Sequence, residues 1–146
     1  MRRQLLSWFC GALAIACAIA PARGDVRILA SPGGEVGTFL QLFETLRESG
    51  ERVIIDGPCY SACTLVLSTI PKDRICVTRR AVLGFHGARL VDRDGNVYIA
   101  PSSVNELVAE TYPAPVQHWI ARRGGLSTKM IVLRGNELFR YYPRCG

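Results

Sequence analysis

Two side chains in this sequence, Ser61 and His86, have the chemistry needed for nucleophilic catalysis on a carbonyl group. Ser61 lies where the strand-like run 52–56 has ended and a mostly apolar, helix-like run begins. His86 closes the apolar run 81–86 and is followed by small residues. A serine hydroxyl is a weak nucleophile until a base removes its proton, and a histidine side chain can do so near neutral pH. The pair therefore indicates a serine-hydrolase type of site.

A third feature is the turn Ser31-Pro32-Gly33-Gly34, between a predicted strand and a predicted helix. Glycines there let the backbone come close to a ligand and direct its N–H groups outward, which can stabilise an oxyanion. Each feature also has an ordinary explanation: a plain turn at 31–34, a helix N-cap at Ser61 and a structural role for His86. The other histidine, His118, stands beside Trp119 in a helical pattern, where we expect a surface or core-edge position.

The first half of the chain alternates strand-like and helix-like segments. Strands are predicted at 26–30 and 52–56. The segments 75–78 and 81–86 are predicted to form either one continuous strand or two separate strands. A helix is predicted over 36–49, where apolar residues recur at helical spacing before Gly50, and a buried helix over 60–70. This order predicts an α/β fold with a mostly parallel sheet flanked by helices.

The second half of the chain is less regular. The turn 92–96 predicts a hairpin between 88–91 and 97–100. Helical patterns follow at 104–109 and 115–123, then a strand at 130–133 and a short helix at 136–141. With no repeat and no low-complexity tract, residues 25–146 are expected to form a single domain.

The first 24 residues have the layout of a secretory signal peptide. Arg2 and Arg3 precede an apolar run, and small residues follow, so cleavage is predicted after Ala22 or Gly24. An uncleaved N-terminal anchor is the alternative. After residue 24 no apolar run is long enough to cross a bilayer, so the mature protein is expected in the periplasm or secreted.

Charge gives little reason to expect nucleic acid as a partner. The formal net charge is +6. It falls to +3 when the three arginines at positions 2, 3 and 23 are removed with the signal. The arginine pairs at 79–80 and 122–123 do not form a stripe and are interpreted as solvated surface. No cofactor is expected.

Cysteine usage agrees with export. Two of the six cysteines leave with the signal, and Cys59, Cys63, Cys76 and Cys145 remain as disulfide candidates. We predict that Cys63 or Cys59 bonds Cys76, and that Cys145 ties the chain end to the body. A zinc site fits poorly because no histidine stands at ligand spacing, so no metal is expected.

The order of these motifs resembles that of the Clp-type protease proteolytic subunit, in the Clp-protease/crotonase-like superfamily. The run 56–64 together with Gly84-Phe85-His86 is similar to exported bacterial proteins of that superfamily. The resemblance covers about residues 26–90. It implies that Ser61 is the nucleophile and His86 the general base. It also implies an oxyanion hole formed by the backbone amides around Gly33, Gly34 and Ala62.

Two departures from the family limit what the resemblance implies. Clp-type proteases orient the histidine with an acidic residue shortly before the final helix, where this chain has no carboxylate at 128–133. Asp92, Asp94 and Glu106 are the candidates to replace it. The family's extra N-terminal strand and its ring-stacking helix have no counterpart, so we do not expect a ring-shaped protease fed by an ATPase.

The sequence therefore leads to a hydrolase hypothesis and two rivals. The first is a serine hydrolase that acts on a peptide, ester or thioester carbonyl. The second is a non-catalytic binding or interaction module on the same scaffold. Binding of an acyl-CoA, as in crotonases, is weaker because that ligand is cytosolic. Homo-oligomerisation stays open.

Overall fold

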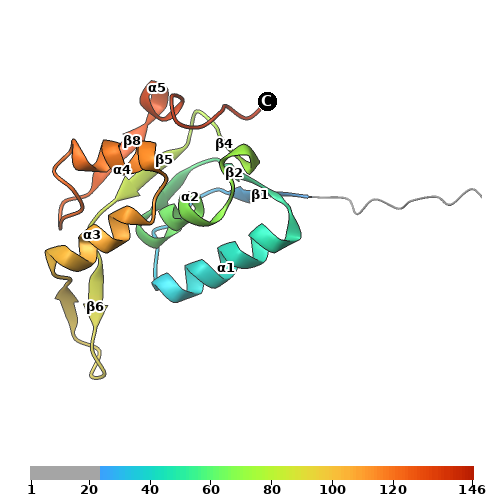
Figure 1. Cartoon of the computed structure of the whole chain (residues 1–146). Helices are drawn as coiled ribbons and strands as arrows, with labels where there is room; N and C mark the ends of the chain where they lie inside the picture. The colour runs from blue at the N-terminus through green and yellow to red at the C-terminus, as the bar shows by residue number, and fades with distance from the viewer. Residues whose placement is uncertain (1–23) are drawn as a thin grey trace, which may run out of the picture.

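The computed structural model describes residues 24–146, so the predicted signal peptide 1–24 lies, except for Gly24, outside the described residues. Short strands and helices are interspersed along the chain (Figure 1). In chain order the elements are β1 (Asp25–Ile28), α1 (Val36–Ser49), β2 (Arg52–Ile55), β3 (Pro58–Tyr60), η1 (Ser61–Leu65), α2 (Val66–Thr69), η2 (Lys72–Arg74), β4 (Ile75–Val77), β5 (Val82–Phe85), β6 (Arg89–Val91), β7 (Val97–Ile99), α3 (Ser102–Glu110), α4 (Ala114–Ala121), β8 (Ile131–Arg134) and α5 (Gly135–Leu138), where η1 and η2 are 3₁₀-helices.

The strands form two three-stranded sheets and a hairpin rather than one mostly parallel sheet. The first sheet has the order β1-β2-β4 and is parallel throughout. The second has the order β3-β5-β8, in which β3 and β5 are parallel and β8 is antiparallel to β5. The α/β class is thus correct, whereas the prediction of a single mostly parallel sheet is only partly correct.

Gly57 is the point at which the chain leaves the first sheet for the second. Its backbone passes so close to β1 that a Cβ atom would lie 1.8 Å from the carbonyl oxygen of Leu29. Only glycine allows this approach. The chain therefore turns directly after β2, and Pro58 begins the separate strand β3.

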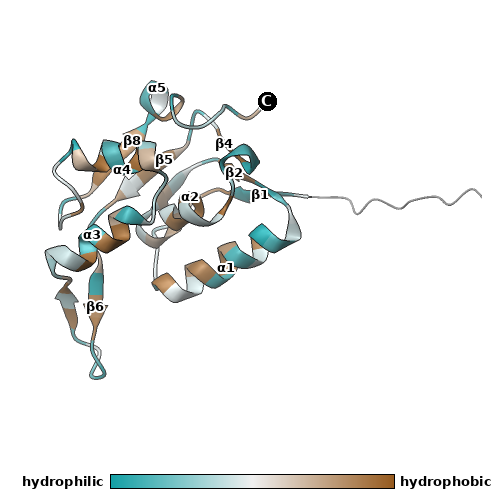
Figure 2. Ribbon diagram, viewed as in Figure 1, coloured by the Kyte–Doolittle hydropathy of each residue, from teal (hydrophilic) through white to brown (hydrophobic). Residues whose placement is uncertain are grey.

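Helix α1 has the ends that its sequence predicts. The Glu35 carboxylate accepts hydrogen bonds from the backbone N–H groups of Gly37 and Thr38, which caps the first turn. Gly50 ends the helix in the left-handed conformation, with φ of 76°. Hydrophobic and hydrophilic residues share the surface of this helix (Figure 2). Its residue Phe43 is buried.

The core joins the second sheet to the helices of the C-terminal half. Phe85 on β5 packs edge-on against Tyr112, with ring centroids 5.3 Å apart, and also contacts Trp119 on α4. These rings are almost completely buried. Because β5 carries Phe85 directly before His86, this packing fixes the end of the strand on which the candidate base stands.

The predicted hairpin is confirmed as β6–β7, which projects from the body of the molecule (Figure 1). All six of its strand residues are exposed. Asp92 closes its turn by accepting hydrogen bonds from the backbone N–H groups of Asp94 and Asn96. Within residues 24–146, no helix has the length and apolar character needed to cross a membrane.

Candidate active site

Three parallel segments bring the predicted site loops to one edge of the second sheet. Ser31, beyond the end of β1, pairs with Cys59: its N–H donates to the Pro58 carbonyl at 2.8 Å, and its carbonyl accepts from Tyr60 at 3.0 Å. On the other side of β3, Tyr60 is opposite Gly84 of β5. The chain continues from these three segments into the loops that contain Gly33, Ser61 and His86.

The candidate nucleophile and base follow strands of the second sheet that are paired in parallel. Tyr60 lies opposite Gly84, and Ser61 comes directly after Tyr60, whereas His86 comes two residues after Gly84. Both residues directly follow the carboxyl ends of adjacent parallel strands, where open α/β sheets place their sites. In the described chain no hydrogen bond joins the Ser61 hydroxyl to the His86 ring.

Ser61 has an unusual backbone conformation. Its φ of 55° is the one positive value outside glycine among residues 24–146. The left-handed region costs a non-glycine residue on the order of 1–2 kcal/mol, so the surrounding structure must impose it. The preceding Tyr60 is extended and Ser61 begins the 3₁₀-helix η1, so the chain turns sharply from strand to helix at this serine.

This turn differs from the single buried helix predicted over 60–70. The segment consists of the last residue of β3, the 3₁₀-helix η1 and the short helix α2. Periodicity alone does not distinguish such a segment from one helix, because its residues are mostly apolar and show no single apolar face. The N-cap position of η1 belongs to Tyr60, so the alternative of Ser61 as a helix N-cap is wrong.

Gly33 lies directly against the serine. A Cβ atom at Gly33 would lie 2.5 Å from the Ser61 Cβ and 2.6 Å from the Tyr60 carbonyl oxygen, and φ at Gly33 is 88°. The position therefore requires glycine both for its conformation and for its neighbours. The Gly33 N–H donates a long bond of 3.3 Å to Ser31 Oγ. Within residues 24–146, the backbone N–H groups of Gly34 and Ala62 form no hydrogen bond to a loop carbonyl or to a side chain.

Two buried hydroxyl groups, those of Thr64 and Tyr112, form hydrogen bonds behind the turn at Ser61. Thr64 donates its hydroxyl hydrogen to the Ser61 carbonyl at 2.7 Å. Its oxygen lies 2.7 Å from the Tyr112 hydroxyl, which must then be the donor because Thr64 has one hydrogen to give. Burial raises the pKa of Tyr112 to about 12, so it keeps that hydrogen at neutral pH. Sequence reasoning missed this pair.

His86 is half-buried, and its ring is held by the next peptide unit. The Nδ1 atom lies 2.7 Å from the Gly87 carbonyl oxygen. In the tautomer that carries its hydrogen on Nδ1, the ring donates to this carbonyl and Nε2 is left as an acceptor. The backbone beyond is fixed by two bonds: Gly87 N–H to the Ser127 carbonyl, and Ala88 N–H to Oδ1 of the buried Asn105.

None of the three candidate acids forms a hydrogen bond with His86 in the described chain. Asp92 instead accepts from the side chains of Asn96 and Tyr98 and from hairpin backbone, and these bonds lower its pKa to about 2. Asp94 and Glu106 are exposed. Asn105 was not predicted, although a polar residue on the apolar face of the 104–109 pattern could have revealed it.

The four cysteines of the described residues form two disulfides, Cys59–Cys63 and Cys76–Cys145. The prediction that Cys59 or Cys63 bonds Cys76 is therefore wrong. The short sequence separation of Cys59 and Cys63 lets them close across the turn itself, with Ser61 between them. The expectation that Cys145 ties the chain end to the body is confirmed. Among residues 24–146, no three His, Cys, Asp or Glu side chains are arranged to hold a metal ion.

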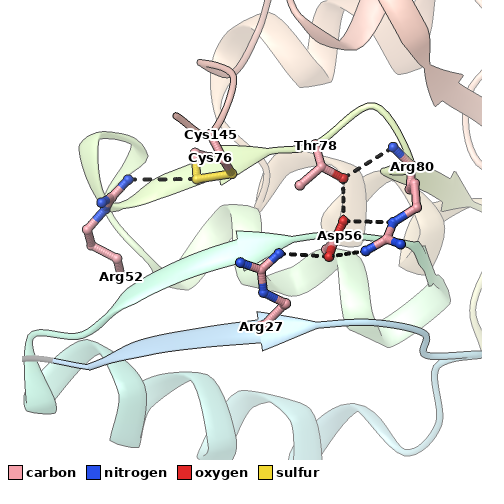
Figure 3. The surroundings of a disulfide bond; sticks show 7 residues. All are labelled: Arg27, Arg52, Asp56, Cys76, Thr78, Arg80 and Cys145. Atoms are coloured by element: carbon pink, nitrogen blue, oxygen red, sulfur yellow. Dashed lines mark hydrogen bonds and ion pairs between the residues drawn. A yellow bond between two sulfur atoms is a disulfide. The ribbon is translucent and has the colours of Figure 1, made fainter.

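A second polar cluster, which sequence reasoning missed, surrounds the buried Asp56 after β2 (Figure 3). Its carboxylate accepts from Arg27 at 2.7 Å, from Thr78 at 2.6 Å and from two nitrogens of Arg80. Hydrogen bonds from Arg80, Thr78 and Arg27 hold the pKa of Asp56 well below its usual range. The cluster links β1, β2 and the residues after β4.

Comparisons with known proteins support the fold. No described protein family matches the sequence, and no curated protein matches it. Among solved structures, the chain is similar to the ClpP1 N165D mutant from Listeria monocytogenes, with a TM-score of 0.51 and 13% sequence identity. The match covers 82% of this chain and 71% of that one. At 13% identity, this structural similarity supports the fold but not the activity. The chain has a Clp-protease-like fold.

Proposed function

We propose that this protein is an exported serine hydrolase in which Ser61 is the nucleophile and His86 the general base. The observation that carries the proposal is the left-handed turn at Ser61, directly after a strand and against Gly33. A serine held at a sharp strand-to-helix turn presents its hydroxyl at the edge of the sheet, which is the arrangement of nucleophilic serines in several hydrolase folds.

In the proposed reaction, Ser61 Oγ attacks the substrate carbonyl carbon while His86 Nε2 takes the hydroxyl proton. The carbonyl oxygen becomes an oxyanion, and the amides of Gly34 and Ala62, together with that of Gly33, would stabilise it. The intermediate collapses as His86 returns the proton to the leaving group. Water, activated by the same imidazole, then hydrolyses the acyl-serine ester and regenerates Ser61.

The partner of His86 implies a slow enzyme. A neutral carbonyl, that of Gly87, occupies the place at Nδ1 where triad enzymes have a carboxylate. It can fix the tautomer and ring orientation but stabilises an imidazolium less than a charged group does. Removing the function of the triad acid lowers kcat by about 10⁴ in the best-studied case, so a low turnover is expected here.

The proposed substrate is a peptide, ester or thioester carbonyl compound. A groove of about 640 Å³ lies between α3, α4 and the 124–128 loop, and both Asn105 and Ser127 line it. The same two residues bond the backbone that follows His86, so the groove shares part of its lining with the support of the candidate base. Its apolar lining suits the side chain or acyl group next to the scissile bond.

A fluorophosphonate probe, which reacts with activated serines, tests the proposal on the purified protein. We expect wild type to be labelled, Ser61→Ala not to be labelled, and His86→Ala to be labelled at least 100-fold more slowly. Ser49→Ala, at the exposed end of α1, is the matched control and should behave as wild type. Equal labelling of wild type and Ser61→Ala, or none of either, would reject the hydrolase.

The carbonyl partner of His86 also favours a second candidate, a non-catalytic binding module that retains the scaffold. This candidate predicts that wild type is not labelled and that Ser61→Ala and His86→Ala leave the ligand affinity of the protein unchanged. The same probe experiment therefore separates the two functions.

Export is part of the proposal. Both disulfides are of the kind that persists in oxidising compartments, and they agree with a periplasmic or secreted location. The mass of the protein recovered from the periplasm or medium tests this directly. We expect cleavage after Ala22 or Gly24 and no free thiol. Recovery of the uncleaved chain from the cytoplasm with six free thiols would contradict it.

A further inference from the structure

The Cys59–Cys63 disulfide lies around the candidate nucleophile. Cys59 is in β3 and Cys63 is in η1, so the bond closes a small ring that contains Tyr60, Ser61 and Ala62. We propose that this disulfide is a positioning element that holds Ser61 in its left-handed turn and thereby sets the direction of its hydroxyl. The catalytic part of this inference rests on the proposed function, whereas the conformational part does not.

The turn needs an external restraint because serine does not favour a positive φ by itself. Two non-covalent contacts act on it, the close approach of Gly33 and the hydrogen bond from Thr64 to the Ser61 carbonyl. Neither contact is covalent, so both can be lost if the backbone around Ser61 relaxes. The disulfide is covalent and joins the segments on both sides of the serine, so it limits the backbone rearrangement that a change of φ at Ser61 would require.

The position of the bond in the core makes it a local restraint. Cys59 and Cys63 are 0% and 1% exposed and pack among the residues of the main hydrophobic cluster. Their sequence separation of 4 constrains little of the unfolded chain, in contrast to the separation of 69 between Cys76 and Cys145. We therefore expect the short disulfide to affect the geometry of the turn more than the stability of the fold.

Neither sulfur is required to touch the substrate, so the bond acts through Ser61. A nucleophile displaced by about 1 Å reacts on the order of 100-fold more slowly, because attack requires a narrow range of distance and angle. The loss appears in the rate of bond formation. The affinity for a reversible ligand in the groove, which is built from other elements, should stay unchanged.

The test compares two double variants of the mature protein. In C59A/C63V the crosslink is absent but most of the buried volume is kept, and C76A/C145A is the matched control that lacks the other disulfide. Backbone chemical shifts measured by NMR report φ at residue 61. The fluorophosphonate experiment reports the maximal labelling rate and the apparent affinity separately.

For C59A/C63V we expect the shifts of Ser61 to move to values typical of a negative φ. We also expect the maximal labelling rate to fall about 100-fold at constant probe affinity. C76A/C145A should keep both wild-type properties wherever it remains folded. Left-handed shifts at residue 61 in C59A/C63V would overturn the inference, and so would wild-type labelling of that variant.

Failure of the proposed function has a different signature. If wild type is not labelled, the hydrolase is rejected, but the NMR shifts of residue 61 in the two variants still decide whether the disulfide holds the turn. A partial unfolding of C59A/C63V would show in the shifts of the whole domain. C59A/C63A, whose side chains fill less of the core, then provides the second measurement. Equal shift changes at residue 61 in C59A/C63V and C59A/C63A would identify the lost crosslink as the cause. A larger change in C59A/C63A would identify the lost packing as the cause and would overturn the inference.

Discussion

Two polar clusters, one at the end of a strand in each sheet, differ in how completely their groups are bonded. The Asp56 cluster, after β2, has a buried carboxylate that accepts from Arg27, Thr78 and Arg80 (Figure 3). The candidate site, after β3 and β5, has a serine hydroxyl without a hydrogen bond in the described chain and an imidazole bonded at one nitrogen. Each region also has its own disulfide.

The difference separates structural roles from chemical ones. A carboxylate surrounded by donors stabilises the fold but has no lone pair exposed to a substrate, and its pKa is far from neutral. A reactive group needs a lone pair that is not occupied by a hydrogen bond, and a backbone that holds the group in place. The strongly lowered pKa of Asp56 thus accompanies a structural role, whereas the bonding pattern favours Ser61 and His86 as the reactive groups.

The largest expected effect is that of Gly33→Ala on the candidate site. The added methyl group would overlap Ser61 Cβ and the Tyr60 carbonyl, and φ at this position disfavours alanine. We expect probe labelling to fall at least 100-fold. Gly95→Ala, at a similar φ of 85° but with open space around it, is the control. Equal labelling of Gly33→Ala and Gly95→Ala would show that the close contact of Gly33 with Ser61 does not matter for the reaction.

The two disulfides should differ in their effect on stability. From loop closure alone, the loss of Cys76–Cys145 should cost about 4 kcal/mol and the loss of Cys59–Cys63 about 2 kcal/mol. Urea unfolding of the two double variants measures both values. The reverse order would indicate that the short bond is mainly a stability element, contrary to the role proposed for it.

Asp56→Asn should destabilise the fold without affecting the probe reaction. The substitution removes the charge that three donor residues surround, so Arg27 and Arg80 lose their common partner. We expect Tm to fall by about 10 °C, while labelling of the folded protein stays within threefold of wild type. A loss of labelling at a temperature where the variant is folded would show that the two clusters are coupled.

Acid should remove the stabilisation that the Asp56 carboxylate supplies. The pKa of this carboxyl is lower in the folded protein than its ordinary value of about 4, so its contribution to stability is complete above that value. The contribution is lost as the pH falls below about 4, toward the lowered pKa. Asp92, with a pKa of about 2, adds a loss of the same sign. Unfolding free energies of Asp56→Asn should show a shallower pH dependence than wild type between pH 4 and 2.

The smallest expected effect is that of Tyr112→Phe. It removes the hydrogen bond to Thr64 but keeps the bond from Thr64 to the Ser61 carbonyl and the packing against Phe85. We expect a loss of about 1 kcal/mol in unfolding free energy and less than a threefold change in labelling. A tenfold loss of labelling would make Tyr112 part of the support of the turn.

Local features of the fold were predictable from the sequence. Helix α1, with Glu35 and Gly50 at its ends, and the turn of the β6–β7 hairpin follow from residues close together in the chain. Capping, glycine conformations and apolar periodicity act over a few residues, so they can be recognised without knowledge of the partners. The same reasoning selected Ser61, His86 and Gly33 as candidates, and their catalytic roles stay predictions.

Only the tertiary structure decided which segments meet. The division into two sheets at Gly57, the donors around Asp56, the pairing of the cysteines and the left-handed Ser61 all depend on neighbours distant in sequence. A strand pattern does not specify its partner strand, and four cysteines permit several pairings. These features were therefore settled by packing: contacts between remote residues determine which of several locally acceptable conformations has the lowest free energy.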